Sequence, residues 1–122
     1  MIGGHIDIIL MVTGALTAVA LLQFIAPVFM LRMIYGEVPK DLPSLALARH
    51  WGLLIFLVGA LLIYGAFHPA VRDPAVVVAA IEKIALGVGV LGTALRHRPV
   101  AAAIAVGDSI IALVYLLYLA GY

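Results

Sequence analysis

Four long apolar runs, separated by short polar segments, constrain the fold of this chain more than any other feature. The runs cover about residues 6–35, 44–68, 74–96 and 99–121. A helix needs about 20 apolar residues to cross the roughly 30 Å hydrocarbon core of a bilayer, and each run is long enough. With 66% of its 122 residues hydrophobic and 11% charged, the chain is far more apolar than a soluble domain. The sequence therefore predicts an all-α integral membrane protein with a single transmembrane domain.

The short connections between the runs predict an up-down four-helix bundle, because such loops force neighbouring helices to be antiparallel. Ser44 is the predicted N-cap of the second helix. Asp73 is the predicted cap of the third helix, with Pro74 at its first position. The first run is longer than a span requires, so it is expected to tilt, to kink at Pro27 or to extend beyond the bilayer.

Basic residues are distributed unevenly between the two ends of the predicted bundle. One end holds only Arg72, and the other holds Arg32, Lys40, Arg49, Arg96 and Arg98. Because Lys and Arg accumulate in cytoplasmic loops, this bias predicts an inner-membrane protein with both termini on the non-cytoplasmic side. The predicted cytoplasmic edge carries a basic cluster of Arg49, His50, Arg96, His97 and Arg98. Such a cluster suits lipid phosphate or an acidic partner, although charged anchors at a span end are the ordinary interpretation.

A small group of polar residues lies deep within the predicted spans and forms the candidate functional site. Its predicted members are Gln23, Glu82, Lys83 and Asp108, with Thr13, Thr17 and Ser109 as neutral companions. A charged side chain at mid-depth costs about 2.5 to 3.5 kcal/mol on insertion scales, so these groups should face protein or water. Lys83 can neutralise either Asp108 or Glu82, and the other acid is then protonated, bonded to a hydroxyl or amide, or matched by a partner molecule.

Small residues at helical spacing predict the faces through which the helices pack. On the third helix one stripe runs through Glu82 to Arg96, and on the fourth another runs from Ala101 through Asp108 to Tyr115. Small side chains let membrane helices approach closely. The predicted helix-packing residues are Gly59, Ala85, Gly89, Gly92, Ala105 and Ala112.

Several classes of site are not expected. The chain has no cysteine and a net charge of +1, which removes thiolate chemistry and gives no case for nucleic-acid binding. There is no nucleophile–base pairing and no phosphate-cradling glycine loop, so neither an enzyme nor a cofactor is predicted. His5, Asp7, His68 and Asp73 should lie at the outer surface and are metal-binding residue types. Their spacing matches no metal motif, and no metal site is predicted.

The segment "LARHWGLLIFLVGALLIYGAF" contains Arg49 and Gly52 in an Arg-x-x-Gly arrangement at the opening of a span. This layout resembles small bacterial four-helix membrane proteins of the DoxX-like group, and it is also similar to the sterol-biosynthesis scaffold family. The resemblance covers the four-helix layout and about one helix. It implies an accessory or scaffolding protein rather than an enzyme, and it carries over no catalytic residue.

The sequence leads to two main functional hypotheses. The first is a non-catalytic accessory or scaffolding subunit of a larger integral membrane protein complex, docking through intramembrane polar and small-residue helix faces and contacting membrane lipids. The second is a homo-oligomeric channel or transporter for protons or a small solute, using Glu82, Lys83 and Asp108. A membrane enzyme or a quinone-binding subunit is a third hypothesis.

Overall fold

The computed structural model describes residues 2–122, which are 87% helical and contain no strand. In chain order the elements are η1 (Ile2–His5), α1 (Ile6–Ala18), α2 (Leu21–Ile25), α3 (Pro27–Tyr35), α4 (Leu42–Phe67), α5 (Pro69–Leu91), η2 (Ala94–His97) and α6 (Pro99–Leu119). Four helical stretches are long and apolar enough to cross a membrane: Ile2–Ile25, Leu42–Phe67, Pro69–Leu91 and Pro99–Leu119. The predicted all-α class is therefore confirmed.

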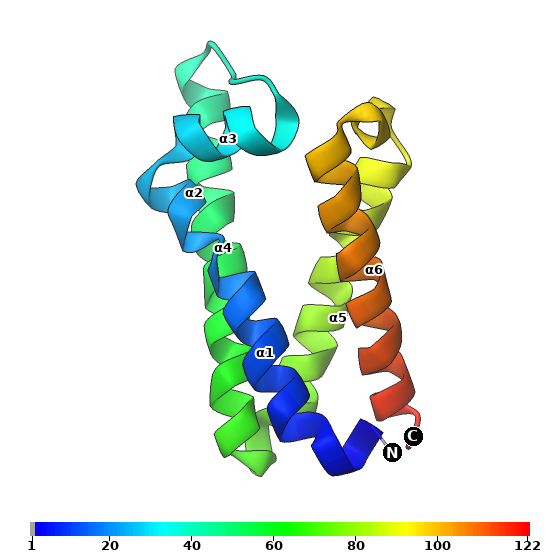
Figure 1. The fold of residues 1–122 in the computed structure, drawn as a ribbon. Helices are drawn as coiled ribbons and strands as arrows, with labels where there is room; N and C mark the ends of the chain where they lie inside the picture. The colour runs from blue at the N-terminus through cyan, green and yellow to red at the C-terminus, as the bar shows by residue number, and fades with distance from the viewer. Residues whose placement is uncertain (1) are drawn as a thin grey trace.

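The helices form two pairs that meet at one end and separate at the other (Figure 1). α1 packs along α4, α6 packs along α5, and α4 and α5 contact one another where they join. We call the end near the chain termini the closed end; its core includes Ile6, Leu10, Leu62, Val76 and Tyr115. The opposite, open end carries α2, α3 and the segment 36–41 on one pair and η2 on the other (Figure 1).

The first apolar run is not one continuous helix. At Val19 and Ala20 the chain keeps helical backbone angles but tightens, and the Ala20 N–H bonds to the carbonyl of Thr17, three residues back, at 3.1 Å. This is a short 3₁₀ stretch. A second break follows at Ala26 (φ −131°, ψ 67°), where the ring of Pro27 disfavours helical geometry in the residue before it. The structure thus has the predicted kink at Pro27 and a further break that the sequence did not predict.

The prediction that Ser44 caps the second long helix is wrong. α4 begins earlier, at Leu42, and the Asp41 carboxylate accepts a hydrogen bond from the Ser44 backbone N–H at 3.0 Å. Asp41 therefore satisfies one of the unpaired N–H groups of the first turn. Both residue types can cap helices, and the extended backbone of Asp41 (φ −89°, ψ 144°) decides between them.

The prediction that Asp73 caps the third long helix, with Pro74 at its first position, is also wrong. α5 begins at Pro69 and ends at Leu91, five residues earlier at each end than predicted, and Pro74 lies inside it. Both prolines are compatible with a helix start in principle, because the first turn does not need the missing N–H. Only Pro69 occupies that position.

The turn between α4 and α5 explains why the helix starts at Pro69. Arg72 donates from Nε to the Gly65 carbonyl at 3.0 Å and from Nη2 to the Ala66 carbonyl at 2.9 Å. These bonds satisfy carbonyls in the last turn of α4, which have no partner within their own helix. Asp73 instead accepts a hydrogen bond from the Tyr118 hydroxyl at 2.7 Å and so ties α5 to α6.

Glycine allows the two helices within each pair to pack closely. A Cβ atom on Gly59 would lie 2.5 Å from the Ala18 backbone nitrogen, so α1 and α4 could not approach as they do with a larger residue. On α5, a Cβ on Gly87 would lie 2.7 Å from Ser109 Oγ of α6. Gly59 is therefore a packing residue, as predicted.

The packing stripe on α6 is where the sequence places it, but the stripe on α5 is not. Ala105 and Ala112 are buried against neighbouring helices. Ala85, Gly89 and Gly92 are exposed on the described chain, and the buried face of α5 consists of Ala75, Val76, Ala79, Ala80, Lys83, Gly87 and Val90. The physical reason is that Lys83, rather than Glu82, turns inward to its partners, which rotates the buried stripe by one residue, or about 100°.

Candidate functional site

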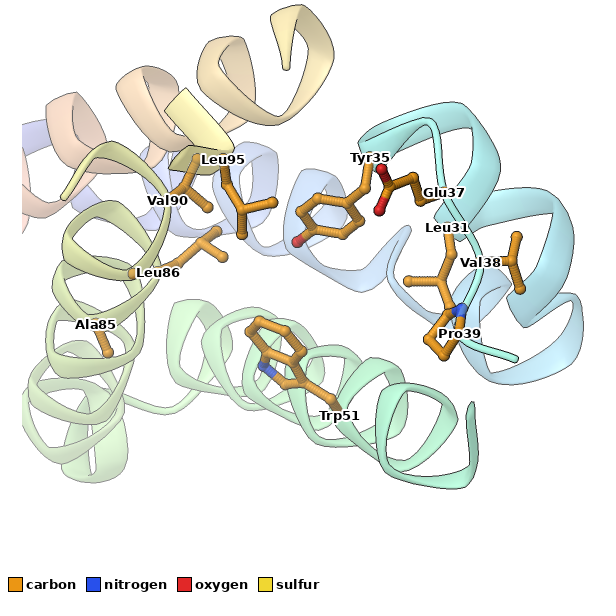
Figure 2. Close-up of a pocket in the computed structure, with 11 residues that line it drawn as sticks. Leu31, Tyr35, Glu37, Val38, Pro39, Trp51, Ala85, Leu86, Val90 and Leu95 are labelled. Carbon is orange, nitrogen blue, oxygen red and sulfur yellow. The ribbon is translucent and has the colours of Figure 1, made fainter. Parts of the chain in front are cut away.

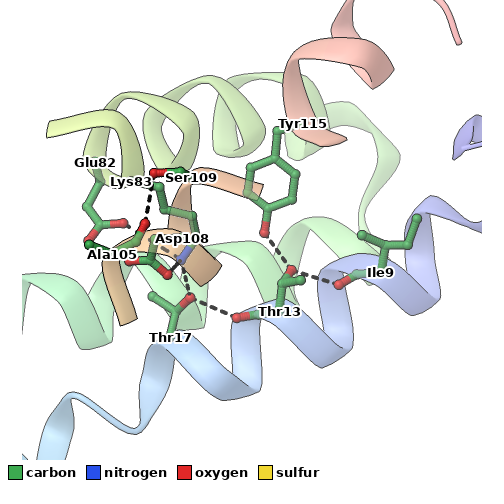
Figure 3. A network of polar contacts seen from close by, with 9 residues as sticks. All are labelled: Ile9, Thr13, Thr17, Glu82, Lys83, Ala105, Asp108, Ser109 and Tyr115. Carbon is green, nitrogen blue, oxygen red and sulfur yellow. Dashed lines mark hydrogen bonds and ion pairs between the residues drawn. The ribbon is translucent and has the colours of Figure 1, made fainter. Parts of the chain in front are cut away.

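Lys83 is the centre of a polar network between the two helix pairs (Figure 3). Its side chain projects from α5 and is only 2% exposed. Nζ donates to Asp108 Oδ1 of α6 at 3.2 Å and to Thr17 Oγ1 of α1 at 2.9 Å. One ammonium group therefore joins three helices, and Asp108 supplies the compensating charge that a buried cation requires.

Two threonines and a tyrosine extend this network towards the closed end (Figure 3). The Thr17 hydroxyl donates to the Thr13 carbonyl at 2.7 Å, and the Thr13 hydroxyl donates to the Ile9 carbonyl at 2.7 Å. Because the Thr13 proton is used in this way, the fully buried Tyr115 hydroxyl is the donor in its short contact with Thr13 Oγ1. The sequence signal is the i, i+4 spacing of the threonines, which places both on one face of α1.

Glu82 is the carboxyl group that the network leaves without a hydrogen bond. Its Oε2 lies 3.9 Å from Lys83 Nζ, which is within ion-pair range but beyond hydrogen-bond range. The same oxygen is buried and has no hydrogen-bond partner. The site therefore combines one ammonium group with two carboxyl groups, and only Asp108 is hydrogen-bonded to the ammonium.

A cavity of about 390 Å³ adjoins the charged cluster on its open-end side. We call it the central cavity. Glu82, Lys83 and Asp108 line one part of it, and Gln23 of α2 lines another. Gln23 is 6% exposed and donates from Nε2 to the Ala48 carbonyl at 2.6 Å, which ties α2 to α4. The four predicted polar residues are thus brought to one cavity, although Gln23 does not bond to the other three.

A second cavity, also of about 390 Å³, lies beside the first and nearer the open end. Figure 2 shows Tyr35 of α3 projecting between Trp51 of α4 and the α5 residues Leu86 and Val90. These four residues line both cavities. The aromatic side chains therefore stand where the two cavities adjoin.

The predicted basic cluster is divided between the two helix pairs. Arg49 lines a groove between α3 and α4 together with Arg32, and His50 is exposed nearby on α4. The remaining residues lie on and after η2, at the start of α6. The open end holds these groups apart, because the helix pairs that carry them separate there (Figure 1).

The η2 half of the basic cluster makes its own contacts. Arg98 forms an ion pair with Glu37, which links the start of α6 to the segment after α3. Arg96 donates to the Thr93 carbonyl at 3.2 Å, and His97 is exposed. Within residues 2–122 no hydrogen bond or ion pair joins these residues to Arg49 or His50.

The polar residues of the closed end have structural contacts. The His68 ring stacks on Tyr64, with ring centroids 3.9 Å apart, and its Nδ1 lies 3.0 Å from the Tyr64 carbonyl. Asp73 is bonded to Tyr118. Across residues 2–122 no group of three or more His, Asp or Glu side chains is arranged to hold a metal ion.

Comparison with known proteins gives no match to this chain among family models, curated proteins or solved structures. Most of the donors in the cluster are bonded to protein, whereas the Glu82 carboxyl accepts no hydrogen bond and is partly exposed beside a cavity. Such an arrangement can bind a cation or a hydrogen-bond donor.

Proposed function

We propose that this chain is a multi-pass inner-membrane protein that serves as a non-catalytic accessory subunit of a larger membrane protein complex. Its four long helices would cross the bilayer in up-down order, with both termini on the non-cytoplasmic side. The basic residues support this orientation, because five of the seven lie at the open end, whereas Arg72 lies at the closed end and Lys83 within α5.

The observation that carries this proposal is an exposed row of small residues along α5, formed by Ala85 and Gly89, with Gly92 directly after the helix; Ala85 and Gly89 also border the second cavity. We call it the outer α5 face. A Cβ atom on Gly89 would meet nothing within 4 Å, whereas on Gly59 or Gly87 it would come within 3.0 Å of a neighbouring helix. Glycine costs about 1 kcal/mol relative to alanine inside a helix, and small residues let a second membrane helix approach. A helix of a partner subunit fits this face.

The polar cluster has a different role in this proposal from the one the sequence suggested. Lys83 and Asp108 bond to one another and to Thr17 within the chain, so they hold its own helices together. Docking through Glu82, Lys83 and Asp108 is therefore less well supported than docking through the outer α5 face.

A channel or transporter is also less well supported. Between the charged cluster and the closed end, Leu10, Leu62 and Tyr115 are fully buried and pack against one another in one core. Flux through one copy would need a route past these side chains. The direct test is proton or solute uptake by liposomes that contain the purified protein, with Glu82→Gln and Asp108→Asn as variants.

The accessory-subunit proposal is tested by affinity purification from membranes in a mild detergent. We expect one larger membrane protein to copurify at fixed stoichiometry and to be lost from Gly89→Leu, because leucine fills the outer α5 face. Ala15→Leu is the matched control, since Ala15 is exposed on α1, and it should retain the partner. Loss in both variants, retention in both, or the absence of a stoichiometric partner would contradict the proposal.

A further inference from the structure

The central cavity has the dimensions and lining of a small-molecule site. Its volume of about 390 Å³ lies within the range of about 300 to 1,000 Å³ that is usual for ligand pockets. The same volume equals only about one turn of an α-helix with its side chains, so a partner helix would not fit. Most of its lining is aliphatic, including Leu16, Ile34, Ile55, Leu86 and Ile104.

The polar part of the lining consists mainly of acceptors. The Lys83 ammonium uses two of its three N–H donors on Thr17 and Asp108, and the Gln23 amide uses one of its two on a carbonyl of α4. The Glu82 and Asp108 side chains line the cavity and keep 16% and 17% of their surface exposed. A carboxylate is an acceptor only, so the head group that this cavity suits is a donor.

The charge of the cluster makes the head group more specific. When both carboxyl groups are ionised, one ammonium and two carboxylates leave one net negative charge. Among apolar side chains an uncompensated charge is costly. A single positive charge in the cavity neutralises the cluster and donates to the part of the Glu82 carboxylate that remains exposed.

Aromatic rings on the other side of the cavity also favour a cation. Tyr35 and Trp51 both line it, from α3 and α4. The faces of tyrosine and tryptophan attract ammonium groups within about 6 Å. Gly107 of α6 adds space, because it lines the cavity and a Cβ atom there would meet nothing within 4 Å.

We propose that the central cavity binds a small amphiphile with one protonated amine as its head and a short apolar body. The head group lies against Glu82 and Asp108, and the body lies along the aliphatic lining towards Tyr35 and Trp51. This binding site does not depend on the outer α5 face, so it goes beyond the accessory-subunit proposal.

The only tryptophan of the chain provides a direct readout, since Trp51 lines the cavity. The full chain is placed in phosphatidylcholine vesicles at pH 7 and titrated with nonylamine, 1-nonanol and nonanoate, which share a chain length. An alkylamine is protonated at this pH, as lysine is. We expect a saturable change in Trp51 fluorescence with nonylamine, and only a linear partitioning signal with the alcohol and the carboxylate.

Two variants distinguish binding in the cavity from general partitioning into lipid. Glu82→Gln nearly preserves the shape of the side chain, and we expect it to raise the Kd for nonylamine roughly 10- to 100-fold, the loss of one charge-assisted hydrogen bond. Gly107→Leu should abolish saturation by filling the cavity. Ala103→Leu is its control, because Ala103 is exposed on the same helix and does not line the cavity. Circular dichroism establishes that each variant is folded.

The proposal is overturned if nonylamine gives no saturable signal, if 1-nonanol saturates equally well, or if folded Glu82→Gln binds nonylamine as the natural sequence does. Its failure is separable from failure of the proposed function. Gly89→Leu should lose the copurifying subunit and keep nonylamine binding, whereas Gly107→Leu should do the reverse.

Discussion

The closed and open ends of the molecule are built from the same kind of apolar helix. They differ in how completely side chains fill the space between the helix pairs. At the closed end, large side chains such as Leu10, Leu62 and Tyr115 are fully buried. At the open end, a smaller core of Val90, Ala101 and Ala105 is packed by Ile34 and Tyr35, and the separating helix pairs leave two cavities beside it. The difference arises on the first apolar run, which breaks at Val19–Ala20 and again at Ala26, so that α3 is the part of this run that contacts α6 at the open end (Figure 1).

The charged cluster lies at the boundary between these two ends. It can therefore join the helices and also remain accessible from the central cavity. Lys83 faces the closed end through Thr17, and Glu82 and Asp108 also line the central cavity. A close-packed interior has no free volume for a ligand. A flexible surface does not hold a charged side chain in a defined position. Only the boundary offers both a rigid support and free volume.

The largest expected effect comes from removing the cation at this boundary. Lys83→Met should lower the free energy of unfolding by about 3 to 5 kcal/mol, because it leaves Asp108 and Glu82 without their counter-charge. Reversible unfolding in mixed detergent micelles measures the loss. The double variant Lys83→Met/Asp108→Leu should recover much of the stability, since no broken pair remains. Wild-type stability in the single variant would show that the cluster does not hold the helix pairs together.

A smaller change in stability is expected when glycines on either side of this boundary are replaced by alanine. Gly59→Ala places a Cβ atom 2.5 Å from a backbone nitrogen of α1, and overpacking of this kind costs about 1 to 3 kcal/mol. Gly107→Ala, where a Cβ atom meets nothing within 4 Å, should be neutral or stabilising by up to about 1 kcal/mol through helix propensity. Thermal unfolding of both variants in one detergent makes the comparison. Equal destabilisation would mean that the open end is as tightly packed as the closed end.

Tyr115→Phe tests the hydrogen bond at the closed end with little change in shape. The loss should be about 0.5 to 1.5 kcal/mol, nearer 0.6 kcal/mol if the bond is typical of membrane proteins. A double-mutant cycle with Thr13→Val measures the coupling, and the two losses should not add because both variants remove the same bond. Fully additive losses would place the Tyr115 hydroxyl on another partner.

The smallest expected effect is at the open end, where Asp41 is exposed. The hydrogen bonds from Ser44 hold the pKa of the Asp41 carboxyl below its usual range. A carboxyl group with a lowered pKa stabilises the folded state above its unfolded pKa of about 3.9, and this contribution is lost as pH falls through the folded value. Asp41→Ala should therefore have a lower melting temperature than the natural sequence at pH 7. The two melting temperatures should converge as the pH falls below about 4.

Asp41→Asn is the control for the pH experiment. Asparagine also caps helices but does not titrate, so its melting temperature relative to Asp41→Ala should not change as the pH falls. A pH-independent difference between the natural sequence and Asp41→Ala would contradict the assignment of the effect to ionisation of Asp41.

The sequence predicts the four apolar helices and the identity of the polar cluster, because both follow from composition and depth alone. It does not predict the break at Val19–Ala20, since no proline or glycine marks it. It also misplaces the start of α5, because Pro69 and Pro74 are locally equivalent and the choice depends on Arg72 reaching the carbonyls of α4.

The sequence of α5 alone also does not predict whether Glu82 or Lys83 points towards the other helices. Small residues at 3- and 4-residue steps favoured a stripe through Glu82, but partners on two other helices, Thr17 and Asp108, select Lys83. The resulting rotation exposes Ala85, Gly89 and Gly92. Information of this kind comes from tertiary contacts, which a single helix does not contain.

The connection between α4 and α5 determines how the molecule is able to deform. Only His68 separates the two helices, and Arg72 secures the carbonyls of Gly65 and Ala66 across the turn. Neither helix can slide along its axis without breaking these bonds. A change in the spacing of the two helix pairs therefore has to occur as a pivot about this corner, so that a small rotation at His68 becomes a large displacement some twenty residues away.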